Sequence, residues 1–526
     1  MGTQQLLDAF QRSYGSFESY PSNLLHQTCH IGTLQAYITR LDNAAAKLFT
    51  KTTPDVVFRD FDPTRQGFSD EKVIDDSKLK DWLGNLGVVN PGPSTGIART
   101  EDPKCRFIFI WAKHSRTYLN ITRKMLVRIL SFHQVMPSYL DFIFLFGSQS
   151  EPRDLRYSGF RAQMLLVDPS QRLAVPSSGR SGRQFQISYN LKCVTCKTSA
   201  SFRAIQSQEW SIRQAAFHHQ FDIVDGTTLW IVTRGGLDIR GSIEDLTGPN
   251  GRPEHRAFRT VEECFKSSLA VHLLYSQWST ADWRGYLQWL EDFTYQETKI
   301  AILGPRGPNQ ARKEYELQDL QKVQDYEDKT NEAIMILETN AHVLNSLRKF
   351  YESLVKSKDF PPGRHCREDV SAFSTQVNEM IYDSRMHIVR AKLLVQIVAD
   401  RMTLISQHLQ SQATQKMEQL TLSMHDIGFQ AQKEAVAMRV ITVVTLFYLP
   451  ATFVSTFFST DIVKYQNSGD LTASFSVTAM VRWLQVTIPL TVLTGGVAFW
   501  WFASVDKKRG VEWQLVNAIR AEIGHS

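Results

Sequence analysis

Hydrophobic positions divide the chain into a part with strand-like runs and a later part with helical spacing. Apolar runs rich in β-branched and aromatic residues predict strands, and they occupy residues 106–111, 140–146, 162–168, 185–194 and 227–232. Between the first two runs, Met125, Ile129 and Phe132 recur at the spacing of a helix. Beyond about residue 256 the pattern is helical, and it breaks at 304–310.

Two long helices are predicted after this break. A charged helix covers about 311–356 and ends at the prolines of 359–363. The next helix carries apolar or small residues in alternating steps of four and three, at Val377, Ile381, Ser384, Ile388, Ala391, Val395, Val398, Met402, Ile405 and Leu409. This heptad pattern is typical of a self-associating helix, and the alternative is a helix that packs only against its own domain.

The same helix is predicted to continue into a membrane. After Leu409 two steps of four reach Met417, which is a stutter that unwinds a coiled coil locally without ending it. No strong break follows, so one helix is expected from about Val377 to Phe458. Residues 440–460 and 483–505 carry no charge, and each segment is long enough to span a bilayer.

Basic residues around these spans predict the orientation of the chain. Lys433 and Arg439 precede the first span, and 507–509 is a basic run after the second. The connecting loop, about 461–480, has few basic residues nearby. We therefore expect a two-pass integral membrane protein with both termini in the cytosol.

Hydroxyl side chains follow one face of the first span. Apolar residues and threonines share this face at steps of three or four, at Met438, Ile441, Thr445, Leu449, Thr452 and Thr456. A threonine can bond its hydroxyl to its own helix, so scattered threonines mean little. A stripe of them that continues a heptad pattern and ends near Asp461 instead indicates an ion path with an acidic mouth.

The predicted fold class is α+β, with a cytosolic α/β domain, a long helical stalk and two C-terminal transmembrane helices. The boundaries follow the changes of pattern. A loosely organised lead-in precedes the α/β domain, a helical region with the stalk, a two-helix membrane domain and a cytosolic tail, at 1–103, 104–255, 256–439, 440–510 and 511–526.

Composition excludes several functions. The net charge of +6, from 59 basic and 53 acidic residues without a concentrated basic stripe, argues against nucleic-acid binding. Six scattered cysteines fit a reducing compartment, and the N-terminus shows no signal peptide.

No enzyme signature, P-loop or dinucleotide fingerprint is present, so no catalytic residue or cofactor is predicted. Cys193 and Cys196 have the spacing of a zinc or redox pair. They lack a second pair and lie in a predicted strand, which favours ordinary core or edge cysteines over a tail-anchored zinc or redox enzyme. His218 and His219 are interpreted as structural or surface residues.

Residues 438–461 resemble the first transmembrane helix of the CorA class of magnesium transporters, most closely the divergent CorA-like proteins of filamentous fungi. In that family the helix has a Met-Lys start, a proline, a Thr-Phe pair and a terminal Tyr-Gly-Met-Asn. Here Met438-Arg439, Pro450 and Thr452-Phe453 match the first three features, while Phe458 followed by Ser459, Thr460 and Asp461 replaces the signature. The resemblance covers about 256–510 well, and 104–255 only in architecture.

The resemblance implies a homopentameric channel or transporter in a lipid bilayer for Mg²⁺ or a related divalent cation, lined by the stripe of the first span. Ser459, Thr460 and Asp461 would then form the outer mouth, where a ring of Asp461 carboxylates meets the hydrated cation. In the family, divalent ions between the cytosolic domains keep the closed state, and Asp383 and Asp400 are the candidates here. Because Gly-Met-Asn is replaced, the alternative is a non-conducting CorA-like membrane protein with a regulatory or scaffold role.

Overall fold

The computed structural model describes residues 3–27, 29–83, 102–114, 117–148, 156–167, 173–196, 210–235, 239–303, 315–459 and 477–523. The chain divides into two compact units, Met1–Leu409 and Gln410–Ser526. Helix α10, Arg367–Ser459, begins in the first unit and ends in the second. The predicted single helix from about Val377 to Phe458 is therefore confirmed.

The first unit is built on a seven-stranded sheet in the order β2-β1-β3-β7-β6-β5-β4. Neighbouring strands are antiparallel, apart from the parallel pair β3 and β7. The strands are β1 Val56–Asp62, β2 Gly67–Val73, β3 Cys105–Ala112, β4 Phe160–Leu165, β5 Gln184–Cys196, β6 Trp210–Asp222 and β7 Thr228–Gly235. The predicted strands at 106–111, 162–168, 185–194 and 227–232 correspond to β3, β4, β5 and β7.

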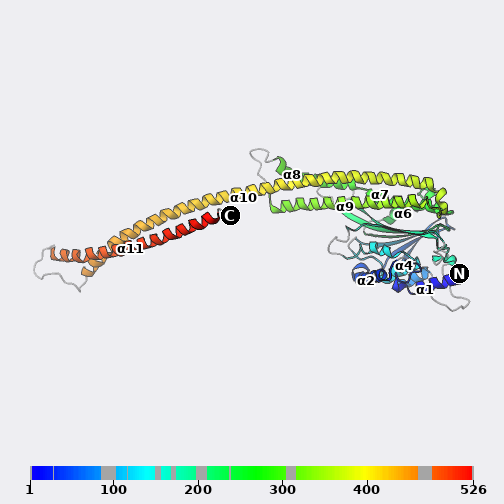
Figure 1. The fold of residues 1–526 in the computed structure, drawn as a ribbon, viewed down its shortest axis with the longest axis horizontal. Helices are drawn as coiled ribbons and strands as arrows, with labels where there is room; N and C mark the ends of the chain where they lie inside the picture. Colours follow the sequence, from blue (N-terminus) through cyan, green and yellow to red (C-terminus); the bar gives the residue numbers. More distant parts are fainter. Residues whose placement is uncertain are drawn as a thin grey trace. The chain divides into compact units, whose positions relative to one another are not determined.

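Helices cover both faces of the sheet (Figure 1). One face is covered by α1 Thr3–Gly15, α2 Ile31–Leu48, α3 Asp76–Leu83, α4 Arg123–Phe132 and α5 Leu140–Ile143. The other face packs against α6 Ile239–Thr247, α7 Val261–Thr280, α9 Leu317–Leu354 and the start of α10. Helix α8, Trp283–Leu303, forms a third apolar core with α9 and α10. The predicted mixed α+β class is confirmed.

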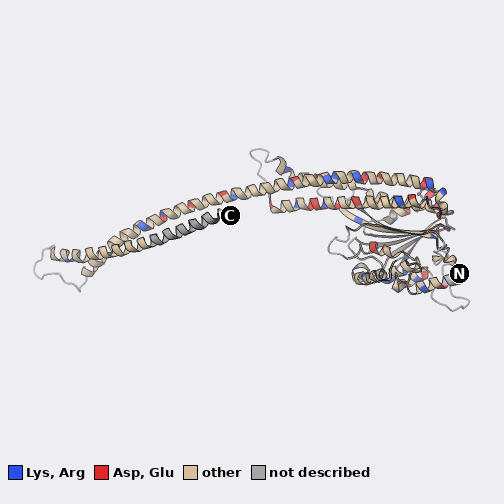
Figure 2. Cartoon of the chain, in the orientation of Figure 1, with Lys and Arg blue, Asp and Glu red and all other residues tan. Residues whose placement is uncertain are grey.

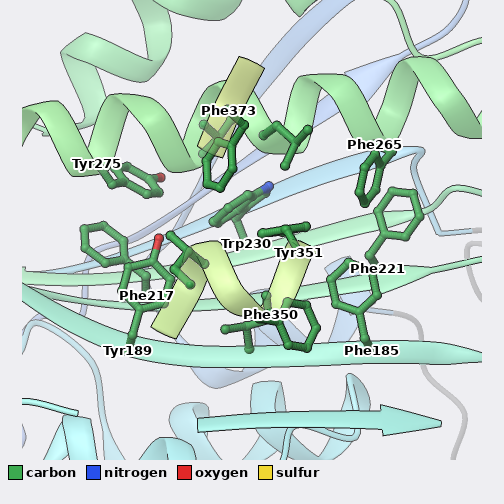
Figure 3. Close-up of a cluster of buried hydrophobic side chains, with 14 of the residues drawn as sticks. Phe185, Tyr189, Phe217, Phe221, Trp230, Phe265, Tyr275, Phe350, Tyr351 and Phe373 are labelled. Carbon is green, nitrogen blue, oxygen red and sulfur yellow. The ribbon is translucent and has the colours of Figure 1, made fainter. Parts of the chain in front are cut away.

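Aromatic rings fill the core between the sheet and α7, α9 and α10. Phe217 of β6 stacks on Tyr275 of α7 with ring centroids 4.0 Å apart (Figure 3). Trp230 of β7 stacks on His219 at 4.1 Å. Tyr351 of α9 closes this cluster from the helix side (Figure 3). Each of these rings is fully or almost fully buried, so the helical layer is held to the sheet by a continuous apolar contact.

The part before residue 104 differs from its prediction as a loosely organised lead-in. Its described residues form helices on one face of the sheet, and β1 pairs with β3 through Val57 opposite Phe109. Phe10 and Phe58 are buried in the same core. The prediction is wrong for this segment, because it contributes two strands and part of the core. The proline- and glycine-rich stretch 90–96 lies outside the described residues.

Two further elements were misread. The run 140–146, predicted as a strand, is helical at α5 and follows a 3-10 turn, Pro137–Tyr139. A short run that is buried all round has no periodicity to separate helix from strand, and a proline at the first position favours a helix. Strand β6 was missed because polar residues such as Gln214 and His218 interrupt its apolar residues without regular alternation, although both are buried.

The heptad side chains of α10 face the core of the first unit. Most of its positions from Val377 to Leu409 lie in the apolar cores shared with α8 and α9, and Val377, Ala391, Val398 and Ile405 are fully buried. Ion pairs fasten the same stretch, from Arg390 to Glu291 of α8 and from Lys392 to Glu338 of α9 at 2.8 Å. The interpretation of this stretch as a self-association seam is therefore wrong, and the alternative that it packs against its own domain holds.

The second unit contains the end of α10 and helix α11, Val477–Ile523. Charged side chains become sparse along the C-terminal part of α10 (Figure 2). Both helices contain a segment long and apolar enough to cross a membrane. Helix α11 continues beyond the predicted second span, through most of the residues expected to form a C-terminal tail. The predicted break at 304–310 and the connecting loop up to residue 476 lie outside the described residues.

Candidate functional site

The predicted stripe lies on one exposed face of α10. Met438, Ile441 and Leu449 are 64%, 57% and 69% exposed, and the three threonines between and beyond them are also exposed. Spacing by three and four residues keeps all of them on one side of the helix. The side chains of the stripe are therefore brought together along α10, and within a single chain nothing among the described residues buries them.

Helix α11 covers the opposite face of α10. Pro450 and Val454 are buried, one helical turn apart. Thr452 and Thr456 are each two residues away from Val454, which is about 200° around a helix with 3.6 residues per turn. The partner helix within the chain thus packs on one side of α10 and leaves the stripe uncovered.

A side-chain hydrogen bond joins the two apolar helices. The indole Nε1 of Trp483 on α11 donates to the Oγ of Ser455 on α10 at 3.0 Å. The sequence predicted no contact for either residue. Residue spacing does not predict this pair, because the two residues lie on different helices.

The threonine hydroxyls of the stripe donate their protons to the backbone of their own helix. Thr445 Oγ1 bonds Thr442 O at 2.9 Å, Thr452 Oγ1 bonds Tyr448 O at 3.0 Å, and Thr456 Oγ1 bonds Thr452 O at 3.0 Å. Because the single hydroxyl proton is used in this way, each oxygen keeps lone pairs that can only accept. The stripe therefore presents a row of hydrogen-bond acceptors to whatever faces it.

An open groove borders the stripe. It has a volume of about 470 Å³, and Leu449, Thr452 and Thr456 line it from α10, with Leu490 and Thr494 from α11. Its walls are almost entirely apolar carbon and hydroxyl groups, without any charged side chain. The edge of the stripe is thus shaped to take apolar side chains or acyl chains.

The predicted outer mouth lies at the end of α10. Ser459 is the last residue of the helix, is exposed, and bonds Thr456 O through its hydroxyl at 3.2 Å. Thr460 and Asp461 lie outside the described residues. The proposed acidic ring therefore stays a prediction from the sequence.

The candidate regulatory acids are not brought together. Asp383 and Asp400 are both exposed on α10 and stand 17 residues apart, which is about 25 Å along a helix. Among the described residues, no group of three or more His, Cys, Asp or Glu side chains could hold a metal ion. Within one chain these two carboxylates cannot share a cation.

The cysteine pair of β5 does not form a metal site. Cys193 is buried and Cys196 is half-buried. Residues three apart in a strand point to opposite faces of the sheet, so the two sulfur atoms cannot meet on one ion.

The paired histidines are core residues. His218 Nδ1 contacts Ser188 Oγ at 2.9 Å, and His219 Nδ1 contacts His272 Nε2 at 3.2 Å. Burial lowers the pKa of His218 to about 3 and also lowers that of His219, so both rings are neutral at physiological pH. They belong to the buried polar core, in line with their interpretation as structural residues.

A family model described as CorA-like transporters matches residues 12–302. The chain belongs to the CorA-like family. The match lies in the first unit and ends within α8, before α9, α10 and α11. It therefore includes 104–255, where the sequence resemblance was expected only in architecture, and it leaves out the membrane motif on which that resemblance was based.

Two solved structures resemble this CorA-like protein more weakly than the family model does. The full-length CmaX protein is 10% identical, with 86% of this chain and 98% of that chain covered and a TM-score of 0.33. The CorA magnesium transporter from Methanocaldococcus jannaschii is 11% identical, with 84% and 96% covered and a TM-score of 0.31. Scores at this level support no argument about function. No curated protein matches the chain.

Family membership and the two apolar helices together make this CorA-like protein a two-pass membrane protein. The family whose model matches is described as transporters.

Proposed function

We propose that the protein is a channel or transporter for divalent metal cations, Mg²⁺ or a related ion, acting as a homopentamer. The pore of this assembly is lined by the stripe of α10, from Met438 to Thr456. The observation that carries the proposal is the position of the stripe on the face of α10 opposite to Pro450 and Val454, which α11 buries. Family membership supplies the class of function.

The chemistry of the stripe suits a hydrated cation. Magnesium gives up its water shell reluctantly, so a pore that passes it contacts the hydrogens of bound water. Thr452 and Thr456 offer acceptor lone pairs to those hydrogens, because their own protons are bonded to the backbone. Ile441 and Leu449 form apolar rings in the same assembly, and such rings close a pore by excluding water.

An exposed apolar surface of the stalk supports self-association. The buried positions of α10 face α8 and α9, yet a second set of large apolar residues on the same stretch is exposed, at Tyr382, Met386, Val389, Leu393, Ile397 and Leu404. Contiguous exposed apolar surface of this kind marks an interaction site. A second copy of the chain is the partner that a homopentamer provides.

The outer mouth follows from the sequence. In a homopentamer, five copies of Asp461 meet around one axis, and their mutual repulsion favours a bound cation. The proposed orientation, with both termini in the cytosol, is supported by Lys433 and Arg439 before the first span and by the basic run 507–509 after the second.

Flux through liposomes tests the proposal. The purified protein is reconstituted at a verified oligomeric state, and entry of Mg²⁺, Co²⁺, Ni²⁺ and Zn²⁺ is recorded. The double variant Thr452→Val and Thr456→Val keeps side-chain shape and removes both acceptors, and we expect Mg²⁺ flux to fall about tenfold, which equals roughly 1.4 kcal/mol of lost ion stabilisation. Asp461→Ala is expected to lower the flux as well.

Thr491→Val on α11 is the matched control, because its hydroxyl also bonds its own helix, at 2.8 Å, but does not belong to the stripe. We expect its flux to equal that of the unmodified protein. Correctly assembled oligomers that pass none of the four ions contradict the proposal and favour the non-conducting regulatory or scaffold role suggested by the replaced Gly-Met-Asn signature.

A further inference from the structure

A small polar cavity lies in the first unit, at the end of the sheet where the inner strands β3 and β7 begin. It has a volume of about 30 Å³, which is room for two or three water molecules. Its polar wall comes from segments far apart in the sequence: Arg106 on β3, His133 at the end of α4, Arg180 before β5, and Gln184 and Gln220 on β5 and β6. The site is separate from the membrane helices and from the stripe of α10.

Arg180 is held rigidly at this cavity. Its Nε donates to Asp102 Oδ2 at 2.6 Å, and its Nη1 donates to Phe132 O at 2.7 Å. The guanidinium also lies over the Phe132 ring, 4.8 Å from its centroid. Its remaining nitrogen, Nη2, is buried and has no partner among the described residues, although the residue is only 8% exposed. One charged donor group is thus positioned and left unused.

Two further polar atoms at the same cavity lack partners. His133 is 4% exposed, and its Nε2 has no hydrogen-bond partner among the described residues. Gln220 donates from Nε2 to Gln184 Oε1 at 2.7 Å, which leaves its own Oε1 buried and without a partner in the described structure. An unpaired buried polar group is unfavourable, because it has lost its hydrogen bonds to water without replacing them. Three of them around one cavity indicate that a polar occupant completes the site.

The two guanidinium groups at the cavity are each paired with a carboxylate, Arg180 with Asp102 and Arg106 with Asp60. Asp102 and Asp222 also line the cavity. Arg106 forms two hydrogen bonds to the Asp60 carboxylate at 2.8 and 2.7 Å, and Asp222 accepts from the backbone and hydroxyl of Ser181 at 2.8 Å. These carboxylates are already satisfied and do not call for a cation. Burial lowers the pKa of His133 well below its usual range, and the charges of Arg180 and Arg106 lower it further. The ring is therefore neutral and lies in a positive field.

We propose that this cavity binds a small oxyanion that keeps one hydroxyl group, of the size of bicarbonate. Two of its oxygens accept hydrogen bonds from Arg180 Nη2 and His133 Nε2, and its hydroxyl donates to Gln220 Oε1. Such an ion satisfies the three unpartnered atoms at once and adds a negative charge next to two guanidinium groups. The inference does not depend on the proposed transport function, because every residue involved lies in the first unit.

Binding is tested on the full-length protein in detergent at pH 7.5 in sealed cells. Titration calorimetry and the thermal unfolding midpoint are recorded with sodium bicarbonate against sodium chloride at equal ionic strength. We expect saturable binding of one bicarbonate per chain and a rise of the midpoint with bicarbonate concentration, because a ligand of the folded state stabilises it. Formate, which has no hydroxyl, is expected to bind about tenfold more weakly, since Gln220 Oε1 stays unpaired. Phosphate is too large for the cavity and is expected not to bind.

Variants separate the site from general salt effects. Gln220→Glu places a carboxylate next to the bound anion. The repulsion is expected to abolish both the binding of bicarbonate and the rise of the thermal midpoint. Gln163→Glu, the same change on β4 of the same sheet but away from the cavity, is expected to keep it. His133→Phe is a second test, which preserves the aromatic contact with Phe132 and removes one donor. Both cavity variants are first compared with the unmodified protein by circular dichroism.

Two results overturn the proposal. One is an unmodified protein whose calorimetric and thermal responses to bicarbonate and chloride are equal, which means that water alone fills the cavity. The other is a folded Gln220→Glu or His133→Phe variant that binds bicarbonate as tightly as Gln163→Glu does, which places the anion elsewhere.

Discussion

Trp483 Nε1 donates a hydrogen bond to Ser455 Oγ at 3.0 Å, and this contact joins α11 to α10. Trp483 is half-buried, and Thr487, one turn further along α11, is 6% exposed. The packing face of α11 therefore carries polar side chains as well as apolar ones. Because α11 is held there, the threonine stripe on the other side of α10 stays open.

Removal of the Trp483–Ser455 bond is expected to weaken the pairing of the two apolar helices. Trp483→Phe deletes the indole donor and keeps an aromatic ring, and Ser455→Ala deletes the acceptor. Hydrogen bonds between membrane helices contribute about 0.6 kcal/mol on average, so we expect a coupling energy of that size in a double-mutant cycle. Unfolding of the protein in mixed micelles measures it. Strictly additive effects of the two substitutions contradict the contact.

Neighbouring residues of α10 are expected to have different roles. Ile388 is 8% exposed and lies in the core with α8 and α9, whereas Val389 is 63% exposed. Ile388→Ala should lower the free energy of unfolding by about 2–5 kcal/mol, because it leaves a cavity. Val389→Ala should leave the stability of the chain within about 0.5 kcal/mol and weaken the oligomer. Chemical denaturation and light scattering measure the two effects. Equal losses of stability would contradict the assignment of faces.

Asn340 of α9 is expected to be a structural residue of the sheet. Strand β4 ends its pairing with β5 at Tyr189, and Asn340 bonds the backbone of Lys192 beyond that point, accepting from its N–H at 3.2 Å and donating to its C=O at 2.7 Å. Asn340→Leu leaves both groups unpaired, and we expect a loss of about 2–4 kcal/mol of unfolding free energy. The control is Asn345→Leu, which removes only a contact with Arg348. A stability loss no greater than that of the control counts against this role.

Acid is expected to destabilise the first unit through its buried histidines. Burial lowers the pKa of His218 and of His272 to about 3, whereas an unfolded histidine has a pKa of about 6.5. Between these values the unfolded state binds protons that the folded state does not, so stability falls as the pH falls from about 6.5 to about 3. Above this window both states are neutral at these residues, and no contribution remains.

The contribution of one histidine can be isolated. His218→Asn retains an acceptor near the position of Nδ1 and removes the titrating group. We expect the slope of unfolding free energy against pH to decrease by about 1.4 kcal/mol per pH unit between pH 6 and 4. A slope that His218→Asn does not alter is evidence against a neutral buried ring.

The elements predicted correctly from the sequence are those that hydrophobic periodicity reveals. The four strands that alternate or run apolar were found, and α10 was predicted as one helix because no proline interrupts it before Pro450. Strand β6 was missed because its buried polar side chains pair with groups that only the fold brings near, such as Ser188 with His218. The heptad positions of α10 were read correctly as a buried face, but spacing cannot tell a partner in the same chain from a second copy.

The candidate sites show the same limit. The stripe from Met438 to Thr456 was predicted as one face, since helical spacing alone determines it. The packing of α11 on the other face of α10 is a tertiary contact, which helical spacing does not predict. The cavity of Arg180, His133 and Gln220 gave no signal, because its residues lie far apart in the chain and belong to no motif.

The unbroken course of α10 has a practical consequence for dissecting the protein. The boundary between Leu409 and Gln410 separates two regions of side-chain packing, while the backbone hydrogen bonds of one helix pass through it. A soluble fragment that stops there does not end in a linker: its last four carbonyl groups lose their helical partners and the terminus frays. A fragment that continues for several turns past Leu409 keeps the buried core around Ile405 covered by intact helix. It is therefore the better choice for isolating the first unit.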